Sequence, residues 1–188
     1  MNLPNKLTLL RICLIPVFAV LFFVKAIPLN YVFATVVFCL AAFTDFLDGY
    51  FARKLGLVTN LGKFLDPIAD KVLVSTAMIL LLTVPEVLPP VIGAICVSVI
   101  LARELMISAF RQIAATQNVV IAADMTGKIK TCFQDVALIV MLVSCQFVGK
   151  GFFVYFFYAG ISLLVIATLL TIISAINYIV KNKAVLKN

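Results

Sequence analysis

The sequence predicts an all-α integral membrane protein, a bundle of six transmembrane helices preceded by a short N-terminal interfacial segment. Of its 188 residues, 64% are hydrophobic and only 12% are charged, whereas soluble domains have about 45–50% apolar and about 25% charged residues. Six apolar runs each approach the roughly 20 residues that a helix needs to cross a bilayer. No separate soluble domain of useful size fits between the apolar runs, so we expect a single domain over residues 1–188.

The six spans are expected, in order, at 8–25, 30–53, 61–83, 88–111, 126–148 and 152–180. Residues 2–8 mix polar and apolar side chains around Pro4, so this segment is expected to lie along the membrane interface before the first span. Pro16 falls inside the first span, where a kink is tolerated. Only a short loop separates the second and third spans, which predicts an antiparallel hairpin.

Basic residues are distributed unevenly between the two sets of span ends, which predicts the orientation of the chain. The net charge is +7, but no long basic run suits nucleic acid, so we expect contacts to membrane lipid and no nucleic-acid partner. Only Lys25 and Lys150 lie near the connections after the first, third and fifth spans. Most other basic residues lie at the opposite ends, which predicts that both termini are cytoplasmic.

Four aspartates in the second and third spans form two pairs. Asp45 and Asp48 are three residues apart, and Asp66 and Asp70 are four apart, so each pair shares one helix face. Clustered carboxylates repel one another and need a cation, and oxygen ligands suit Mg²⁺, Ca²⁺ or Mn²⁺ better than zinc. Ion pairs with nearby basic residues would explain one or two aspartates but not two same-face pairs. The sequence therefore predicts a divalent-metal active site near the cytoplasmic side.

The chain contains no histidine, so the commonest general base in enzymes is absent. Proton abstraction near neutral pH would fall to Asp, Glu, Lys or Tyr.

The aspartates belong to a longer pattern, D-x2-D-G-x2-A-R-x8-G-x3-D-x3-D. Its fixed positions are Asp45, Asp48, Gly49, Ala52, Arg53, Gly62, Asp66 and Asp70. The segment 45–70 resembles the signature of the CDP-alcohol phosphotransferase family, integral membrane enzymes of phospholipid synthesis. Eight specified residues at fixed spacing are far more specific than a lone glycine-rich loop.

This resemblance implies displacement at a phosphorus of a CDP-linked lipid, with CMP as the leaving group. It implies that Asp45, Asp48, Asp66 and Asp70 bind Mg²⁺ or Mn²⁺, as two ions, and that Asp70 is also the general base. The nucleotide is expected near Asp45, Gly49, Ala52, Arg53 and Gly62. The family also implies a homodimer.

The acceptor is suggested by looser resemblances at 2–11, 103–104 and 127–131, which are similar to the phosphatidylglycerophosphate synthase branch of the family. That branch implies transfer of the phosphatidyl group from CDP-diacylglycerol to glycerol 3-phosphate, on the cytoplasmic side of a bacterial cell membrane. Such an anionic acceptor needs a cationic pocket. The candidates for it are Thr8, Arg11, Arg103, Arg111, Lys128 and Lys130.

Several alternatives remain open. Related enzymes accept serine, inositol, inositol phosphate or phosphatidylglycerol, and basic residues alone do not exclude these acceptors. Arg103 could bridge Glu104 or extend toward the membrane surface, Lys128 and Lys130 could be ordinary interfacial lysines, and Arg53 could only anchor its helix end. A cation transporter is disfavoured, because transporter sites usually lie at the midplane between repeated halves, and the chain has no repeat.

Overall fold

The computed structural model describes residues 3–55, 60–116 and 125–181, and within them the side chains of 46, 48–55, 60, 61, 63 and 64 and a few other helix-end residues are not described. The described residues form six α-helices and one 3₁₀-helix. These are α1 (Leu3–Phe23), α2 (Asn30–Leu55), α3 (Asn60–Leu81), α4 (Pro90–Thr116), α5 (Met125–Ser144), η1 (Cys145–Phe147) and α6 (Phe153–Lys181). The six predicted helices are confirmed, with ends that differ by a few residues.

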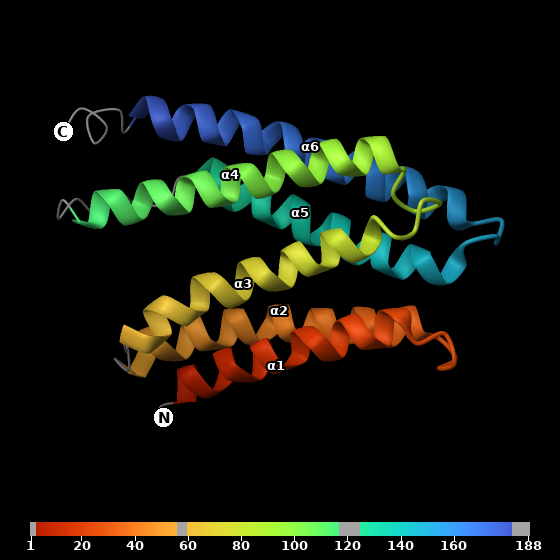
Figure 1. Cartoon of the computed structure of the whole chain (residues 1–188), viewed down its shortest axis with the longest axis horizontal. Coiled ribbons are helices and arrows are strands. Elements are labelled where there is room, and N and C mark those ends of the chain that lie inside the picture. Colours follow the sequence, from red (N-terminus) through yellow and green to blue (C-terminus); the bar gives the residue numbers. More distant parts are fainter. Residues whose placement is uncertain (1–2, 56–59, 117–124, 182–188) are drawn as a thin grey trace.

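The helices run back and forth along one long axis (Figure 1). The packing pairs α1 with α2 and α3, and α6 with α5 and α4, while α5 also contacts α2 and α3. The N-terminal end of α1, the C-terminal end of α2, the N-terminal end of α3 and the C-terminal end of α6 lie at the same end of the bundle (Figure 1). The α2–α3 hairpin and α5 therefore meet across the middle of the molecule.

The prediction of a separate interfacial segment at residues 2–8 is wrong for the described part of it. α1 begins at Leu3 and continues without a break to Phe23. Pro4 is the second residue of this helix, where a missing N–H costs little. Asn5 and Thr8 are buried in the first turns, so this stretch packs inside the bundle rather than along its surface.

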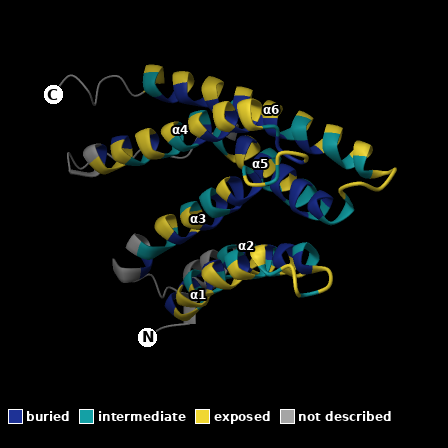
Figure 2. Cartoon of the chain, turned by 45° about the vertical axis from the view of Figure 1, so that its right-hand side comes forward, coloured by how far each residue is buried: buried dark blue, intermediate teal, exposed yellow. Residues whose placement is uncertain are grey.

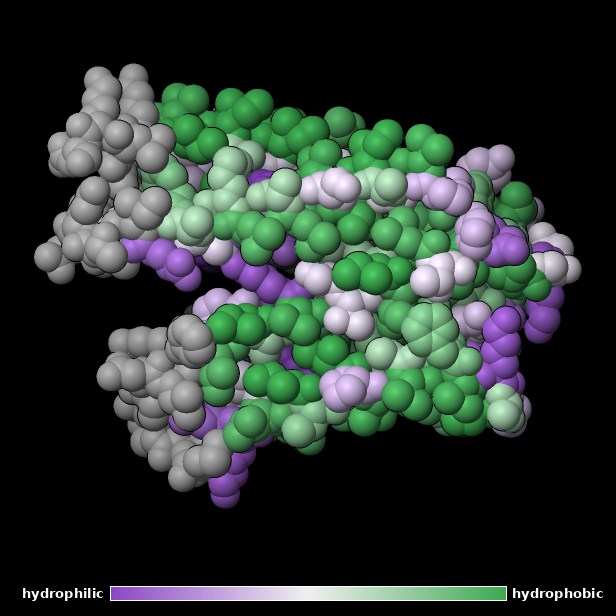
Figure 3. All heavy atoms as spheres, viewed as in Figure 1, coloured by the Kyte–Doolittle hydropathy of each residue, from purple (hydrophilic) through white to green (hydrophobic). Residues whose placement is uncertain are grey.

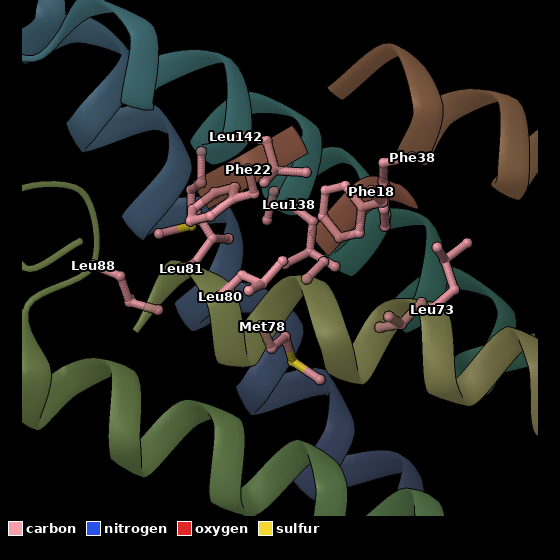
Figure 4. Packing of buried hydrophobic residues seen from close by; sticks show 14 of the residues in the cluster. Phe18, Phe22, Phe38, Leu73, Met78, Leu80, Leu81, Leu88, Leu138 and Leu142 are labelled. Carbon is pink, nitrogen blue, oxygen red and sulfur yellow. The ribbon is translucent and has the colours of Figure 1, made fainter. Parts of the chain in front are cut away.

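The core fills the half of the bundle away from the aspartates. Phenylalanines of α1 and α2 lie beside leucines of α3 and α5 (Figure 4), and the rings of Phe18 and Phe38 are 5.7 Å apart between centroids. A methyl group added at Gly160 would lie 2.6 Å from Cγ of Met141. This glycine lets α6 approach α5 closely, as small residues do in membrane bundles.

The outer surface is apolar over most of its length, as expected for a protein in contact with lipid. Exposed residues follow the outer faces of the helices (Figure 2), and many are large and apolar, such as Val20, Leu105 and Ile176. Soluble monomers rarely expose such continuous apolar surface. The chain is an integral membrane protein.

Four described helical segments are long and apolar enough to cross a membrane: Asn5–Phe23, Pro90–Gln112, Gly127–Phe147 and Phe153–Lys181. In α2 only the shorter segment Asn30–Asp45 is apolar, and α3 carries charged residues in its first half. The six-span prediction is thus supported for four helices by composition. The two exceptions are the helices that carry the aspartate signature.

Candidate active site

A polar pocket of about 160 Å³ lies where α2, α3, α4 and α5 meet. It is lined by Asp45, Asp70, Lys71, Val74, Glu104, Thr131, Gln134 and Asp135. In the surface view, hydrophilic residues gather in a hollow that enters the molecule between α3 and α4 (Figure 3). A hydrated, charged pocket inside an apolar bundle is typical of a functional site, because burying charges in a membrane is costly.

The hairpin brings one aspartate of each predicted acidic pair to this pocket. Asp45 on α2 and Asp70 on α3 line the same pocket, and Asp66 lies one helical turn before Asp70. Asp48, Gly49, Ala52 and Arg53 belong to α2, but their side chains lie outside the described part. Gly62 is buried near the start of α3.

α1 supplies two side chains that contact the aspartates. The sequence did not predict these contacts. Thr8 and Arg11 are three residues apart and share one face of α1. Thr8 Oγ1 donates a hydrogen bond of 2.6 Å to Asp66 Oδ1. Arg11 Nη1 lies 2.9 Å from Asp45 Oδ1. One face of α1 thus connects the acidic residues of α2 and α3.

Arg11 is completely buried and has several partners on α2. Its Nε donates to the carbonyl oxygen of Ala41 at 3.3 Å and to Thr44 Oγ1 at 3.4 Å. Its side chain is 0% exposed, whereas that of Asp45 is 44% exposed. The guanidinium therefore lies behind the carboxylate, which keeps its other side open toward the pocket.

The donor set fits a hard divalent cation in its chemistry, because carboxylate oxygens from two neighbouring helices are the ligands that Mg²⁺ and Mn²⁺ prefer. Among the side chains that the structure describes, no three acidic, cysteine or histidine side chains lie close enough together to hold a metal ion. Asp48, the fourth residue of the predicted set, is not among the described side chains.

The wall formed by α4 and α5 contains a buried ion pair. Lys130 Nζ lies 2.7 Å from Glu104 Oε1, and the Lys130 side chain is 0% exposed. Lys71 of α3 donates to Ser108 Oγ, which in turn donates to the carbonyl oxygen of Glu104 at 2.7 Å. Glu104 and its neighbours therefore connect α3, α4 and α5 around the pocket.

The remaining predicted cations lie toward α6 or on the surface. Arg103 Nη2 donates to Ser174 Oγ at 2.7 Å, so Arg103 contacts α6, while Glu104 pairs with Lys130. Arg111 Nε donates to Tyr178 OH at 3.2 Å, and its guanidinium carbon lies 5.6 Å from the centre of that ring. Lys128 is exposed.

None of the six residues predicted to bind the acceptor phosphate is among the residues that line the pocket. Two of them contact residues that do line it: Arg11 forms an ion pair with Asp45, and Lys130 forms one with Glu104. Sequence reasoning missed Gln134 and Asp135, which do line it. The available signal was their spacing from Thr131, because residues at i, i+3 and i+4 share one helix face.

Comparisons with known proteins identify the family of the chain. Residues 1–180 match the CDP-alcohol phosphatidyltransferase family. The chain is 41% identical to the CDP-diacylglycerol–glycerol-3-phosphate 3-phosphatidyltransferase of Bacillus subtilis, over 99% of this chain and 97% of that protein. It is 40% identical to the protein of the same name from Rickettsia bellii (94% and 93%) and 38% identical to that from Salmonella paratyphi A (95% and 93%). The chain therefore belongs to the CDP-alcohol phosphatidyltransferase family.

Proposed function

We infer that the protein transfers the phosphatidyl group of CDP-diacylglycerol to glycerol 3-phosphate, giving phosphatidylglycerophosphate and CMP. The observation that carries this inference is similarity over nearly the whole chain to bacterial proteins that bear this activity in their names. The acidic pocket inside an apolar bundle supports it, because a lipid-linked diphosphate must meet a water-soluble acceptor. Such an enzyme acts in phospholipid biosynthesis.

Metal dependence is part of the proposal. Asp45, Asp48, Asp66 and Asp70 would hold Mg²⁺ or Mn²⁺, as two ions, and the ions when bound would neutralise the diphosphate. Thr8 and Arg11 support two of these carboxylates by the contacts described above. Hydrogen-bonded partners of this kind orient metal ligands and are often needed for activity.

In the proposed reaction, a hydroxyl oxygen of the acceptor forms a bond to the phosphorus next to diacylglycerol, and the bond from that phosphorus to the CMP oxygen breaks. The proton of the hydroxyl passes to the carboxylate of Asp70, which lines the pocket. CMP leaves as the anion. Positioning the two reactants and excluding competing water are the main tasks of the protein.

The substrates are proposed to occupy the two sides of this pocket. The nucleotide would lie along the signature residues Asp45, Gly49, Ala52, Arg53 and Gly62. The acceptor phosphate would be attracted by the surrounding cations of α1, α4 and α5, which are Arg11, Arg103, Arg111, Lys128 and Lys130, together with Thr8. Arg111 and Lys128 are the exposed members of this set and are the most accessible to an incoming anion.

We further propose that all six helices cross the membrane, with both termini and the pocket facing the cytoplasm. In support, the N-terminal end of α1 and the C-terminal end of α6 lie at the end of the bundle where the basic residues predict the cytoplasm (Figure 1). The homodimer implied by the family remains a proposal, which light scattering of the purified protein in detergent would test.

The decisive experiment measures CMP release by the full-length protein, purified in detergent and supplied with CDP-diacylglycerol. Glycerol 3-phosphate, serine, inositol and phosphatidylglycerol are offered separately, each with Mg²⁺, Mn²⁺ or a chelator. We expect release only with glycerol 3-phosphate and a metal ion. Release with another acceptor would assign the chain to a different branch of the family, and metal-independent release would remove the proposed role of the four aspartates.

A further inference from the structure

Gln134 is a buried polar residue in the pocket that the mechanism above does not use. Its side chain is 1% exposed, and it lines the pocket from α5. Its Oε1 is buried and has no hydrogen-bond partner in the part of the chain that the structure describes. A buried amide oxygen without a partner is destabilising, so a residue of this kind at a pocket wall points to a bound group that supplies a donor.

The other polar groups of the pocket are already engaged or are acidic. Asp45 contacts Arg11, Lys71 contacts Ser108, Glu104 contacts Lys130, and Thr131 Oγ1 donates to the carbonyl oxygen of Lys128. Asp70 and Asp135 are carboxylates, which suit a metal ion or a proton. Gln134 is therefore the uncharged group of this wall whose buried acceptor has no partner among the described residues, and an uncharged acceptor can bind a hydroxyl group without repelling an anionic substrate.

We propose that Gln134 binds the middle hydroxyl of glycerol 3-phosphate, the hydroxyl that does not react, through a hydrogen bond from that hydroxyl to Oε1. The terminal hydroxyl is then directed at the phosphorus from the side of α3 where Asp70 lies. This makes Gln134 a specificity-determining residue. The inference rests on the proposed function, because it concerns the acceptor of the same reaction.

The test compares two acceptors in the wild-type protein and in Gln134→Met. The second acceptor is 3-hydroxypropyl phosphate, which keeps the phosphate and the terminal hydroxyl but lacks the middle one. We expect the wild type to prefer glycerol 3-phosphate by about tenfold in kcat/KM, the value of one buried hydrogen bond. Gln134→Met should lose this preference through a higher KM for glycerol 3-phosphate, with the KM for CDP-diacylglycerol unchanged.

Gln146 offers a matched control. Its Oε1 is also buried and has no partner among the described residues, but it lies in η1, twelve residues and thus about 18 Å further along the helix axis. Gln146→Met removes the same group outside the pocket, so we expect it to keep the tenfold preference. Gln134→Glu, which retains an accepting oxygen, should keep the preference while using both anionic acceptors less efficiently.

The outcomes separate the inference from the function. If the Gln134→Met protein uses both acceptors with equally reduced efficiency, or still prefers glycerol 3-phosphate by tenfold, Gln134 does not bind the hydroxyl. If Gln134→Met does not fold, loss of the preference in Gln134→Glu overturns the proposal and its retention supports it. A wild-type protein that uses neither acceptor would contradict the proposed function itself.

Discussion

Among the described residues, Arg11 is the largest fully buried side chain that carries a full charge, and its contacts with Asp45 and α2 explain how it is tolerated. Replacing it with methionine should lower the melting temperature by about 5–10 °C, because the carboxylate and the α2 groups lose their partner. Turnover should fall as well, since Asp45 loses its orientation. Thermal unfolding followed by circular dichroism in detergent measures the first effect, and CMP release measures the second.

Lys6→Met is the matched control for that variant, because Lys6 is exposed on the same helix. It should leave the melting temperature within about 2 °C of the wild type. An Arg11→Met protein that melts like the control would show that the contact with Asp45 contributes nothing to stability.

Asp66→Asn should separate metal binding from folding. The amide oxygen of asparagine can still accept the hydrogen bond that Thr8 donates to Asp66, so the contact between α1 and α3 and the melting temperature should be kept. A neutral amide is a much weaker ligand for Mg²⁺ or Mn²⁺, so CMP release should fall by at least about 100-fold. Activity assays over a range of metal concentrations measure this.

Glu86→Gln provides the control for Asp66→Asn, since it makes the same change from acid to amide at an exposed position between α3 and α4. We expect it to be as active as the wild type. Near-normal turnover of Asp66→Asn would count against the metal site at these aspartates.

At the residue scale, two of the aspartates singled out by the sequence, Asp45 and Asp70, line the pocket, whereas the contacts that their neighbours make were not predicted. The four aspartates stand at fixed helical spacing, which a single sequence displays directly. The bond from Thr8 to Asp66 joins positions 58 residues apart, and no spacing rule relates α1 to α3. Thr8 and Arg11 were therefore predicted only to bind the acceptor phosphate. In the structure, Thr8 bonds to the carboxylate of Asp66 and Arg11 to that of Asp45.

At the scale of the helix, α5 presents two lysines with different environments. Lys128 is exposed, whereas Lys130 is buried against Glu104 of α4. We expect Lys128→Ala to raise the KM for glycerol 3-phosphate by about tenfold and to leave the melting temperature unchanged. Lys130→Ala should lower the melting temperature by about 5–10 °C, because Glu104 loses its partner inside the bundle.

Kinetics and melting of these two variants, measured side by side, distinguish binding from stability. The KM for CDP-diacylglycerol should stay constant in Lys128→Ala. Equal changes in both KM values would argue against a role of this lysine in binding the acceptor phosphate.

The helices themselves were predictable because each of the six apolar runs approaches the length that a helix needs to cross a bilayer. The start of α1 was not, because the interfacial prediction depended on the mixed composition of residues 2–8. The same polar residues, Asn5 and Thr8, turn inward in the structure, and Thr8 finds a partner far away in the sequence, Asp66.

At the scale of the whole molecule, α2 and α3 must be reconciled with a membrane environment. By composition alone, the charged residues of α2 and α3 make these helices less apolar than the four candidate spans. In the structure, however, Asp45 pairs with Arg11 and Lys71 bonds to Ser108 inside the bundle. Charges that face a bundle interior and have partners are compatible with a transmembrane helix. We therefore expect both helices to cross the bilayer together with the four apolar ones.

Reporter fusions test this expectation at one informative position. With six spans and a cytoplasmic N-terminus, the end of α2 is cytoplasmic, whereas with only the four apolar spans it lies outside. A green fluorescent protein fused after Leu55 should therefore fluoresce, and an alkaline phosphatase fused at the same residue should be inactive. A phosphatase fused after Glu86 should be active in either case and serves as the control. An active phosphatase after Leu55 would mean that α2 does not cross, and the pocket would then have to receive its acceptor from the opposite side of the membrane.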